Sequence, residues 1–170
     1  MKKISNYFGN QLLIFQKSIL KREFELRTGD ELIARLYYPK FFSDLAEITL
    51  QEETYEFYRP KFFSRDVDVR KKRHQNPIAQ FKNNFWGSKG VLELPRGIRV
   101  NMKFGVFRKQ AEIYLGENDL VVTIISRFSF KERSKIIIEK RSDVLDEYPW
   151  VIMFAFYLSQ LRKRNSAARG

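Results

Sequence analysis

The segment PWVIMFAFYLSQLRKR, residues 149–164, is the most informative part of the sequence about the fold. Every residue from Trp150 to Leu158 is apolar or aromatic, so a helix here is hydrophobic on all sides rather than along one stripe. Such a helix must be buried all round. Lipid is a poor candidate, because nine helical residues span only ~14 Å against a hydrocarbon core of ~30 Å. We therefore predict that the helix lies inside the protein's own barrel.

Signals at both ends support the helix. Asp143, Asp146 and Glu147 precede Pro149, and carboxylates and proline both favour the first turn of a helix. Basic residues at 162–164 suit its negative end. We predict a central hydrophobic α-helix over about residues 147–163, followed by a short flexible basic tail from about residue 165.

The chain before residue 141 alternates with a period of two. In the segment 98–104, Ile98, Val100, Met102 and Phe104 face one way while the polar residues between them face the other. Turn signals such as Asn76-Pro77 follow at short intervals, and the segments number about twelve. The sequence predicts an all-β fold with one C-terminal helix, a closed antiparallel barrel of about twelve strands built as a meander around that helix.

Length and composition favour one domain over residues 1–170. The chain has 170 residues, 44% of them hydrophobic, and no cysteine, which excludes thiol chemistry and disulfides. Polar residues interrupt the segment 1–15, so no signal peptide is predicted, and no apolar run is long enough to span a membrane. We expect a cytoplasmic protein, with a peripheral attachment to the membrane as an option.

The sequence Pro-Lys-Phe-Phe-Ser occurs twice, in YYPKFFSD (37–44) and in YRPKFFSR (58–65), 21 residues apart. At this offset Tyr37 matches Tyr58, and Ile48 matches Val69. Two copies are too few for a solenoid but suit repeated hairpins in a meander.

Each repeat places two phenylalanines side by side. In an extended backbone adjacent side chains point to opposite faces, so only one of each pair can enter the core. We expect that one to close the end of the barrel. The alternative is an exposed Lys-Phe tip that enters a bilayer interface. The membrane-loop candidates are Lys40, Phe41, Phe42, Lys61, Phe62 and Phe63.

The net charge of +12, from 32 Lys and Arg against 20 Asp and Glu, favours polyanionic partners such as anionic membrane or nucleic acid. The densest cationic stretch is the basic run, Arg70, Lys71, Lys72 and Arg73, our candidate for binding an anionic ligand. The alternative is a solvated loop without a ligand.

The sequence contains no arrangement of residues that is typical of a catalytic site. His74 is the single histidine and follows the basic run, so neither a triad nor a histidine-metal site can be assembled. Asp66 and Asp68 share one face of a predicted strand, and we interpret them as part of a solvated outer face. The segment 87–90, Gly-Ser-Lys-Gly, is read as a turn because no helix follows it. We expect no catalytic residues, no metal, no cofactor and no enzymatic activity.

The strand and turn series from Leu12 to Lys140, closed by the helix from Pro149 to Leu158, resembles the tubby C-terminal-like superfamily. This group includes tubby domains, LURP-one-related proteins, phospholipid scramblases and small bacterial barrels, and this chain looks most like the small bacterial type. The resemblance covers nearly the whole chain and implies binding or scaffolding rather than catalysis. No residue here matches the phosphoinositide-binding motif of tubby domains, and the lack of cysteine departs from the acylated cluster of scramblases.

These observations predict a non-enzymatic, tubby-like binding or scaffolding protein that engages anionic phospholipid or a membrane surface through basic loops. Two alternatives stay open: a basic β-barrel that binds nucleic acid, which is the less favoured partner, and a protein-interaction module with no lipid ligand.

Overall fold

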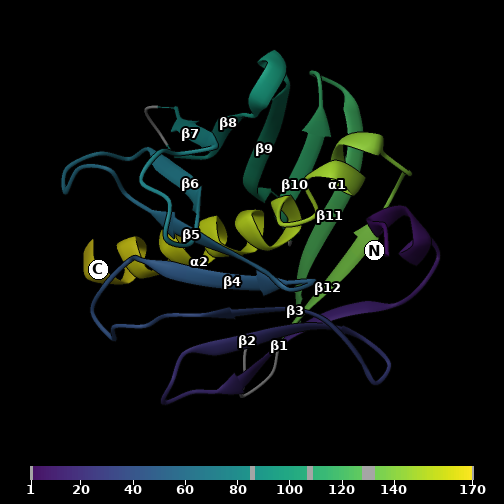
Figure 1. The fold of residues 1–170 in the computed structure, drawn as a ribbon, viewed down its shortest axis with the longest axis horizontal. Coiled ribbons are helices and arrows are strands. Elements are labelled where there is room, and N and C mark those ends of the chain that lie inside the picture. Colours follow the sequence, from purple (N-terminus) through teal and green to yellow (C-terminus); the bar gives the residue numbers. More distant parts are fainter. Residues whose placement is uncertain (1, 85–86, 107–108, 128–132, 170) are drawn as a thin grey trace.

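A computed structural model describes residues 2–84, 87–106, 109–127 and 133–169. It shows a closed antiparallel barrel of twelve strands, as the alternation predicts (Figure 1). The strands are β1 (Leu12–Ser18), β2 (Glu23–Thr28), β3 (Glu31–Tyr37), β4 (Ala46–Leu50), β5 (Glu53–Tyr58), β6 (Val67–Lys71), β7 (Ala79–Asn83), β8 (Lys89–Glu93), β9 (Arg99–Val106), β10 (Lys109–Leu115), β11 (Asp119–Arg127) and β12 (Arg133–Ile138).

Each strand pairs with its neighbours in sequence, and the barrel closes where β1 pairs with β12. The closing register places Leu12 opposite Ile136 and Ile14 opposite Ser134. Leu12 and Ile14 are fully buried, because alternate residues of every strand point into the barrel. Among the twelve strands that the structure describes, this meander leaves no free sheet edge.

The barrel interior is filled by α2 (Val151–Arg169), which confirms the predicted central helix. All residues from Trp150 to Ser159 are buried. The ring of Phe154 meets those of Phe57 and Phe81 edge to face, with centroids 5.0 and 5.8 Å apart. A helix that is apolar on every side is therefore surrounded by the strands of the barrel.

The helix boundaries differ from the prediction. A short helix, α1 (Asp143–Glu147), is capped by the hydroxyl of Ser142, which accepts a hydrogen bond from the backbone of Leu145. The chain then breaks at Tyr148, because the residue before a proline is disfavoured in the helical region. The predicted tail is wrong in its conformation, since residues 165–169 continue α2.

A buried polar network sets the position of α2 in the barrel. Gln110 of β10 donates to the hydroxyl of Ser159 at 2.7 Å and accepts from the hydroxyl of Ser134 at 2.6 Å. The Ser159 hydroxyl in turn donates to the carbonyl of Phe156. A slip of the helix along its axis would leave these buried groups unpaired, which is costly.

The end at which α2 enters is covered by other segments. The backbone of Ser5, in a 3-10 helix η1 (Ile4–Tyr7), donates to the Asp146 carboxylate of α1 at 2.7 Å. Arg96, in a second 3-10 helix η2 (Pro95–Gly97), pairs with Glu147 through both carboxylate oxygens. We call this the entry end, comprising residues 2–11, 29–30, 51–52, 72–78, 94–98, 116–118 and 139–150.

Candidate functional site

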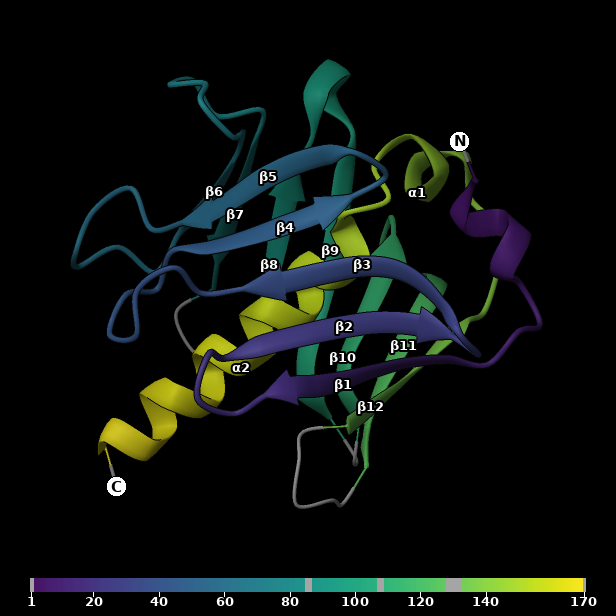
Figure 2. The ribbon, with the colours of Figure 1, turned by 60° about the horizontal axis from the view of Figure 1, so that its bottom comes forward.

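The opposite end of the barrel carries the candidate site. In an antiparallel meander the connections alternate between ends, so the connections after β1, β3 and β5 lie together. The C-terminal half of α2 emerges among them, away from α1 and the N-terminus (Figure 2). We call this the loop end, comprising residues 19–22, 38–45, 59–66 and 158–168.

The two Pro-Lys-Phe-Phe-Ser loops have the same hydrogen bonds. The Ser43 amide donates to the carbonyl of Lys40 at 3.2 Å, and the Ser64 amide donates to that of Lys61 at 3.0 Å. The Ser43 hydroxyl accepts from the backbone two residues on, and so does that of Ser64. The repeat in sequence is thus a repeat in structure, on consecutive hairpins of the barrel.

The expectation that one phenylalanine of each pair closes the barrel is wrong. Phe41, Phe42, Phe62 and Phe63 are 61, 90, 81 and 92% exposed. The expectation assumed an extended backbone, but each pair occupies the two central positions of a turn and projects outward. The rings of each pair pack edge to face on one another, with centroids 4.9 and 5.0 Å apart.

Asp44 connects the two loops to the helix. Its carboxylate pairs with Arg59, at the start of the second loop, and with Arg164 of α2 at 3.1 Å. Its carbonyl accepts from the Tyr157 hydroxyl at 2.6 Å. Burial raises the pKa of Tyr157 well above its ordinary value, so the hydroxyl stays protonated and keeps donating. The exposed phenylalanine turns are therefore held in place by hydrogen bonds and ion pairs at their base.

The turn between β1 and β2 adds aliphatic side chains to the same end. Ile19 is 56% and Leu20 88% exposed. Arg22, which follows them, donates to the carbonyl of Phe41 at 3.0 Å and lies over the ring of Tyr38. Of the eight large hydrophobic side chains that are exposed within the described chain, six belong to the loop end; the others are Phe8 and Leu32.

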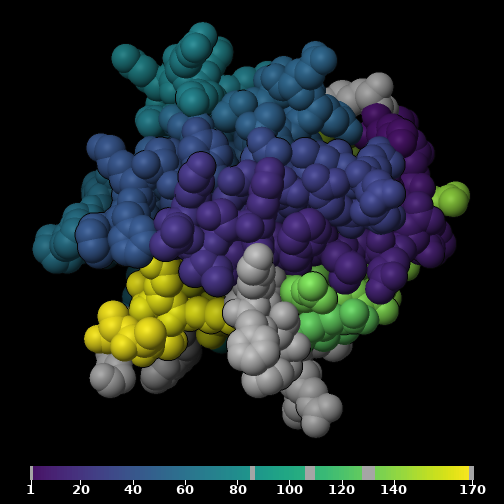
Figure 3. Space-filling view, turned by 90° about the horizontal axis from the view of Figure 1, so that it is seen from below, coloured from purple at the N-terminus to yellow at the C-terminus, as the bar shows by residue number. Residues whose placement is uncertain are grey.

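Charge is distributed as unevenly as hydrophobicity. The loop end contains nine Lys or Arg and two Asp, a net +7. The entry end contains seven Lys or Arg and seven Asp or Glu, a net charge of zero. The loop end of the barrel is thus both cationic and apolar. The C-terminal part of α2 is exposed at this end, beside the first strands of the barrel (Figure 3).

The basic run does not belong to this end. It lies on β6 and in the turn after it, toward the entry end. Arg70 pairs with Glu56 at 2.6 Å, Lys71 with Glu53 at 3.4 Å and Lys72 with Glu47 at 2.8 Å. Arg73 is exposed in the turn, beside the exposed His74. Partner carboxylates offset most of the run's charge, which the sequence alone does not reveal.

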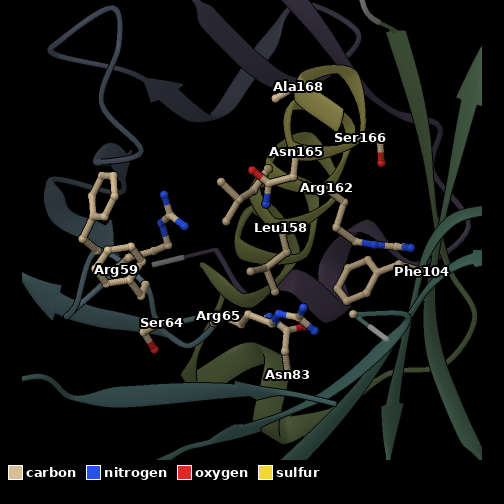
Figure 4. A pocket seen from close by; sticks show the side chains of 14 residues that line it. Arg59, Ser64, Arg65, Asn83, Phe104, Leu158, Arg162, Asn165, Ser166 and Ala168 are labelled. Carbon is tan, nitrogen blue, oxygen red and sulfur yellow. Dashed lines mark hydrogen bonds between the residues drawn. The ribbon is translucent and has the colours of Figure 1, made fainter. Parts of the chain in front are cut away.

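A pocket of about 700 Å³ opens at the loop end, between loop 59–66 and α2 (Figure 4). Its apolar floor is Phe104, Leu158 and Leu161, all nearly fully buried. Arginines 59, 65 and 162 line its sides, and none of its described lining residues is acidic. Sequence reasoning missed this pocket, because loop 59–66, β9 and α2 come together only in the closed barrel.

The Asp66 and Asp68 pair departs from the predicted solvated face. Val67 and Val69 point into the core as expected, but Asp68 is only 7% exposed. Burial first, and repulsion from Asp66 second, raise the pKa of Asp68 above its ordinary value. Because the folded state then binds the proton more tightly than the unfolded state, Asp68 costs stability once the pH has risen through that raised pKa.

Asp68→Asn is therefore expected to stabilise the protein at pH 7, because the amide has no charge to desolvate. We expect the melting temperature to rise by roughly 2–4 °C. Differential scanning calorimetry at pH 7 and at pH 3 measures this. The gain should vanish at pH 3, where the wild-type carboxyl is protonated in both states. A gain of equal size at both pH values would show that charge is not the cause.

Comparisons with known proteins were made with protein-family models, curated proteins and solved structures. None of them matches the chain. The tubby-like resemblance therefore stays a prediction, and the geometry of the loop end carries the functional argument. Within the described chain, no helix is long and apolar enough to cross a bilayer, and no three His, Cys, Asp or Glu side chains gather as a metal would need.

Proposed function

We propose that this protein is a non-enzymatic, peripheral membrane-binding barrel that docks its loop end on an anionic phospholipid surface. One observation carries the proposal: six exposed apolar side chains and nine cations share this end, while the entry end is neutral. Exposed apolar groups rimmed by cations are typical of interfacial binding. The resemblance to tubby-like barrels supports the same conclusion.

The two kinds of contact reinforce one another. Moving a large apolar side chain from water into the interface contributes ~1.5–3 kcal/mol if burial is complete. Each cation near anionic headgroups contributes ~1 kcal/mol. Lys40 and Lys61 directly precede the phenylalanine pairs, so their ammonium groups reach the phosphates when the rings enter the bilayer. Neither kind of contact requires the barrel to change shape.

A membrane fits this surface better than nucleic acid does. Proteins that bind single strands present aromatic faces on which bases stack. Here each phenylalanine ring is held edge to face by its neighbour, and Ile19 and Leu20 are aliphatic. Aliphatic side chains are stabilised by burial in a bilayer, but they have no aromatic face on which a base can stack.

Leu20→Ser combined with Phe42→Ser tests the proposal. These side chains are 88 and 90% exposed, so the variant is expected to fold normally. Co-sedimentation with phosphatidylcholine vesicles, with and without phosphatidylserine, should show binding to the anionic vesicles only, weakening from 50 to 500 mM salt. The double variant should bind at least about tenfold more weakly, a loss of ~1.4 kcal/mol.

Matched controls come from the entry end and from the start of β3, which adjoins it. Phe8→Ser with Leu32→Ser removes the two other exposed hydrophobic side chains and should leave binding unchanged. Lys3→Gln with Arg73→Gln removes two exposed cations there and should also have little effect. Equal losses in the control and test variants would refute the docking orientation. Tighter binding to a single-stranded RNA, measured by fluorescence anisotropy, would move the protein to the nucleic-acid class.

A further inference from the structure

The pocket at the loop end combines a charged wall with an apolar floor. Phe104, Leu158 and Leu161 form the floor and are 2, 3 and 7% exposed. The polar side chains at its rim are Ser64, Asn83, Asn165 and Ser166. Its volume of about 700 Å³ lies within the usual range for small-molecule sites. A ligand that fills it must therefore be polar at one end and apolar along its length.

Among the residues that line the pocket, Arg162 is well placed to bind an anionic ligand. It is half-buried on α2 and lies over the ring of Phe104, 5.4 Å from the centroid. Burial lowers the pKa of its guanidinium, and no carboxylate pairs with it within the described chain. By contrast, Arg59 pairs with the carboxylate of Asp44, which also pairs with Arg164. A partly desolvated cation without a counter-ion favours binding of an anion.

The backbone beside Arg162 accommodates this arrangement. Gly105 of β9 has φ +68°, and a Cβ added there would lie 3.4 Å from a terminal nitrogen of Arg162. The lack of a side chain at Gly105 leaves room for the guanidinium, which lies beside Phe104 in Figure 4. In the same view, Arg65 lies below Leu158.

We propose that this pocket binds a single-chain anionic amphiphile, with its phosphate or carboxylate head against Arg162 and its acyl chain along the two leucines of the floor. This inference deepens the proposed function, on which it rests for the source of the ligand. Phe62 and Phe63 form part of the pocket's rim, so docking of the loop end brings the pocket's mouth to the lipid interface.

The experiment measures binding without any bilayer, by isothermal titration calorimetry with oleoyl lysophosphatidic acid below its critical micelle concentration. Two further probes separate head from chain. Oleoyl lysophosphatidylcholine retains the chain but has a zwitterionic head, and glycerol 3-phosphate retains the phosphate without a chain. We expect each to bind at least about tenfold more weakly than the anionic lysolipid. Equal binding of all three, or no binding of the lysolipid, would overturn the proposal.

Two substitutions locate the site. Ser166 is exposed on α2 and lines the pocket, so Ser166→Trp should fill the space without disturbing the core. We expect it and Arg162→Gln each to weaken lysolipid binding at least about tenfold, while Ser166→Ala and Arg73→Gln leave it unchanged. If Ser166→Trp binds like the wild type, the ligand lies elsewhere.

The two proposals can fail separately. Leu20 and Phe42 do not line the pocket, so their double serine variant should lose vesicle binding and keep lysolipid binding. Ser166→Trp should show the opposite. If the protein binds vesicles but not the lysolipid, the proposed docking surface is supported and the proposed ligand pocket is refuted. Lysolipid binding by a protein that ignores anionic vesicles would overturn the docking surface alone.

Discussion

Phe154→Asp is expected to abolish folding. Phe154 is fully buried in the first turn of α2, where its ring meets those of Phe57, Phe81 and Trp150. The substitution removes an aromatic side chain, at ~3–5 kcal/mol, and buries an unpaired carboxylate, at several kcal/mol more. Together these match the ~5–15 kcal/mol that stabilises a typical domain. Circular dichroism on heating should show no cooperative transition.

Two controls separate charge from position. Phe154→Leu keeps an apolar side chain there and should cost only about 1–2 kcal/mol. Ser166→Asp adds the same carboxylate to the exposed part of α2 and should change stability by less than about 0.5 kcal/mol. A Phe154→Asp protein that remains monomeric and melts at the wild-type temperature would show that α2 does not occupy the barrel.

Gly90→Ala is expected to cost about 3 kcal/mol, near the upper end for overpacking a core. A Cβ at Gly90 would lie 2.1 Å from the ring of Phe81 and 2.8 Å from the carbonyl oxygen of Lys82. Neither neighbour can yield easily, because Phe81 is fully buried against Phe154 and the carbonyl belongs to the adjacent strand. Urea denaturation measures the change in the free energy of unfolding.

The Phe81→Leu background tests the cause. A smaller side chain at position 81 removes the contact with the ring but not the one with the carbonyl of Lys82, so Gly90→Ala should cost about 1–2 kcal/mol there, giving a coupling energy of ~1–2 kcal/mol in a double-mutant cycle. Additive costs would mean that the ring of Phe81 does not fill the space beside Gly90.

Gly90 also illustrates the limit of reading short motifs. As a Gly-Ser-Lys-Gly segment it indicates a turn, and Gly87 does lie between β7 and β8 with φ +70°. Gly90, however, lies within β8, where it lacks a side chain to make room for a ring on the neighbouring strand. Nothing local distinguishes the two glycines. The difference depends on what packs against each of them.

The architecture follows from the sequence because its signals are local and periodic. Alternation in segments such as 98–104 predicts two-faced strands, and the run from Trp150 to Leu158 demands burial on all sides. These two conditions are met together when the sheet closes around the helix. The repeat at an offset of 21 likewise predicts paired hairpins, which the shared hydrogen bonds of Ser43 and Ser64 confirm.

The candidate site depended on tertiary structure. The amino-acid sequence shows which residues are cationic and which are aromatic, but the topology of the closed meander places each of them at one end of the barrel or the other. Arg70 therefore lies against Glu56 on the neighbouring strand, whereas Arg59, Arg162 and the two phenylalanine loops meet at one end. The alternating pattern predicts only which face of a strand is buried, because it depends on neighbouring residues within that strand. Charge compensation depends on which strands pair and in which register. The pocket depends on contacts between distant segments, which exist only once the barrel has closed around α2.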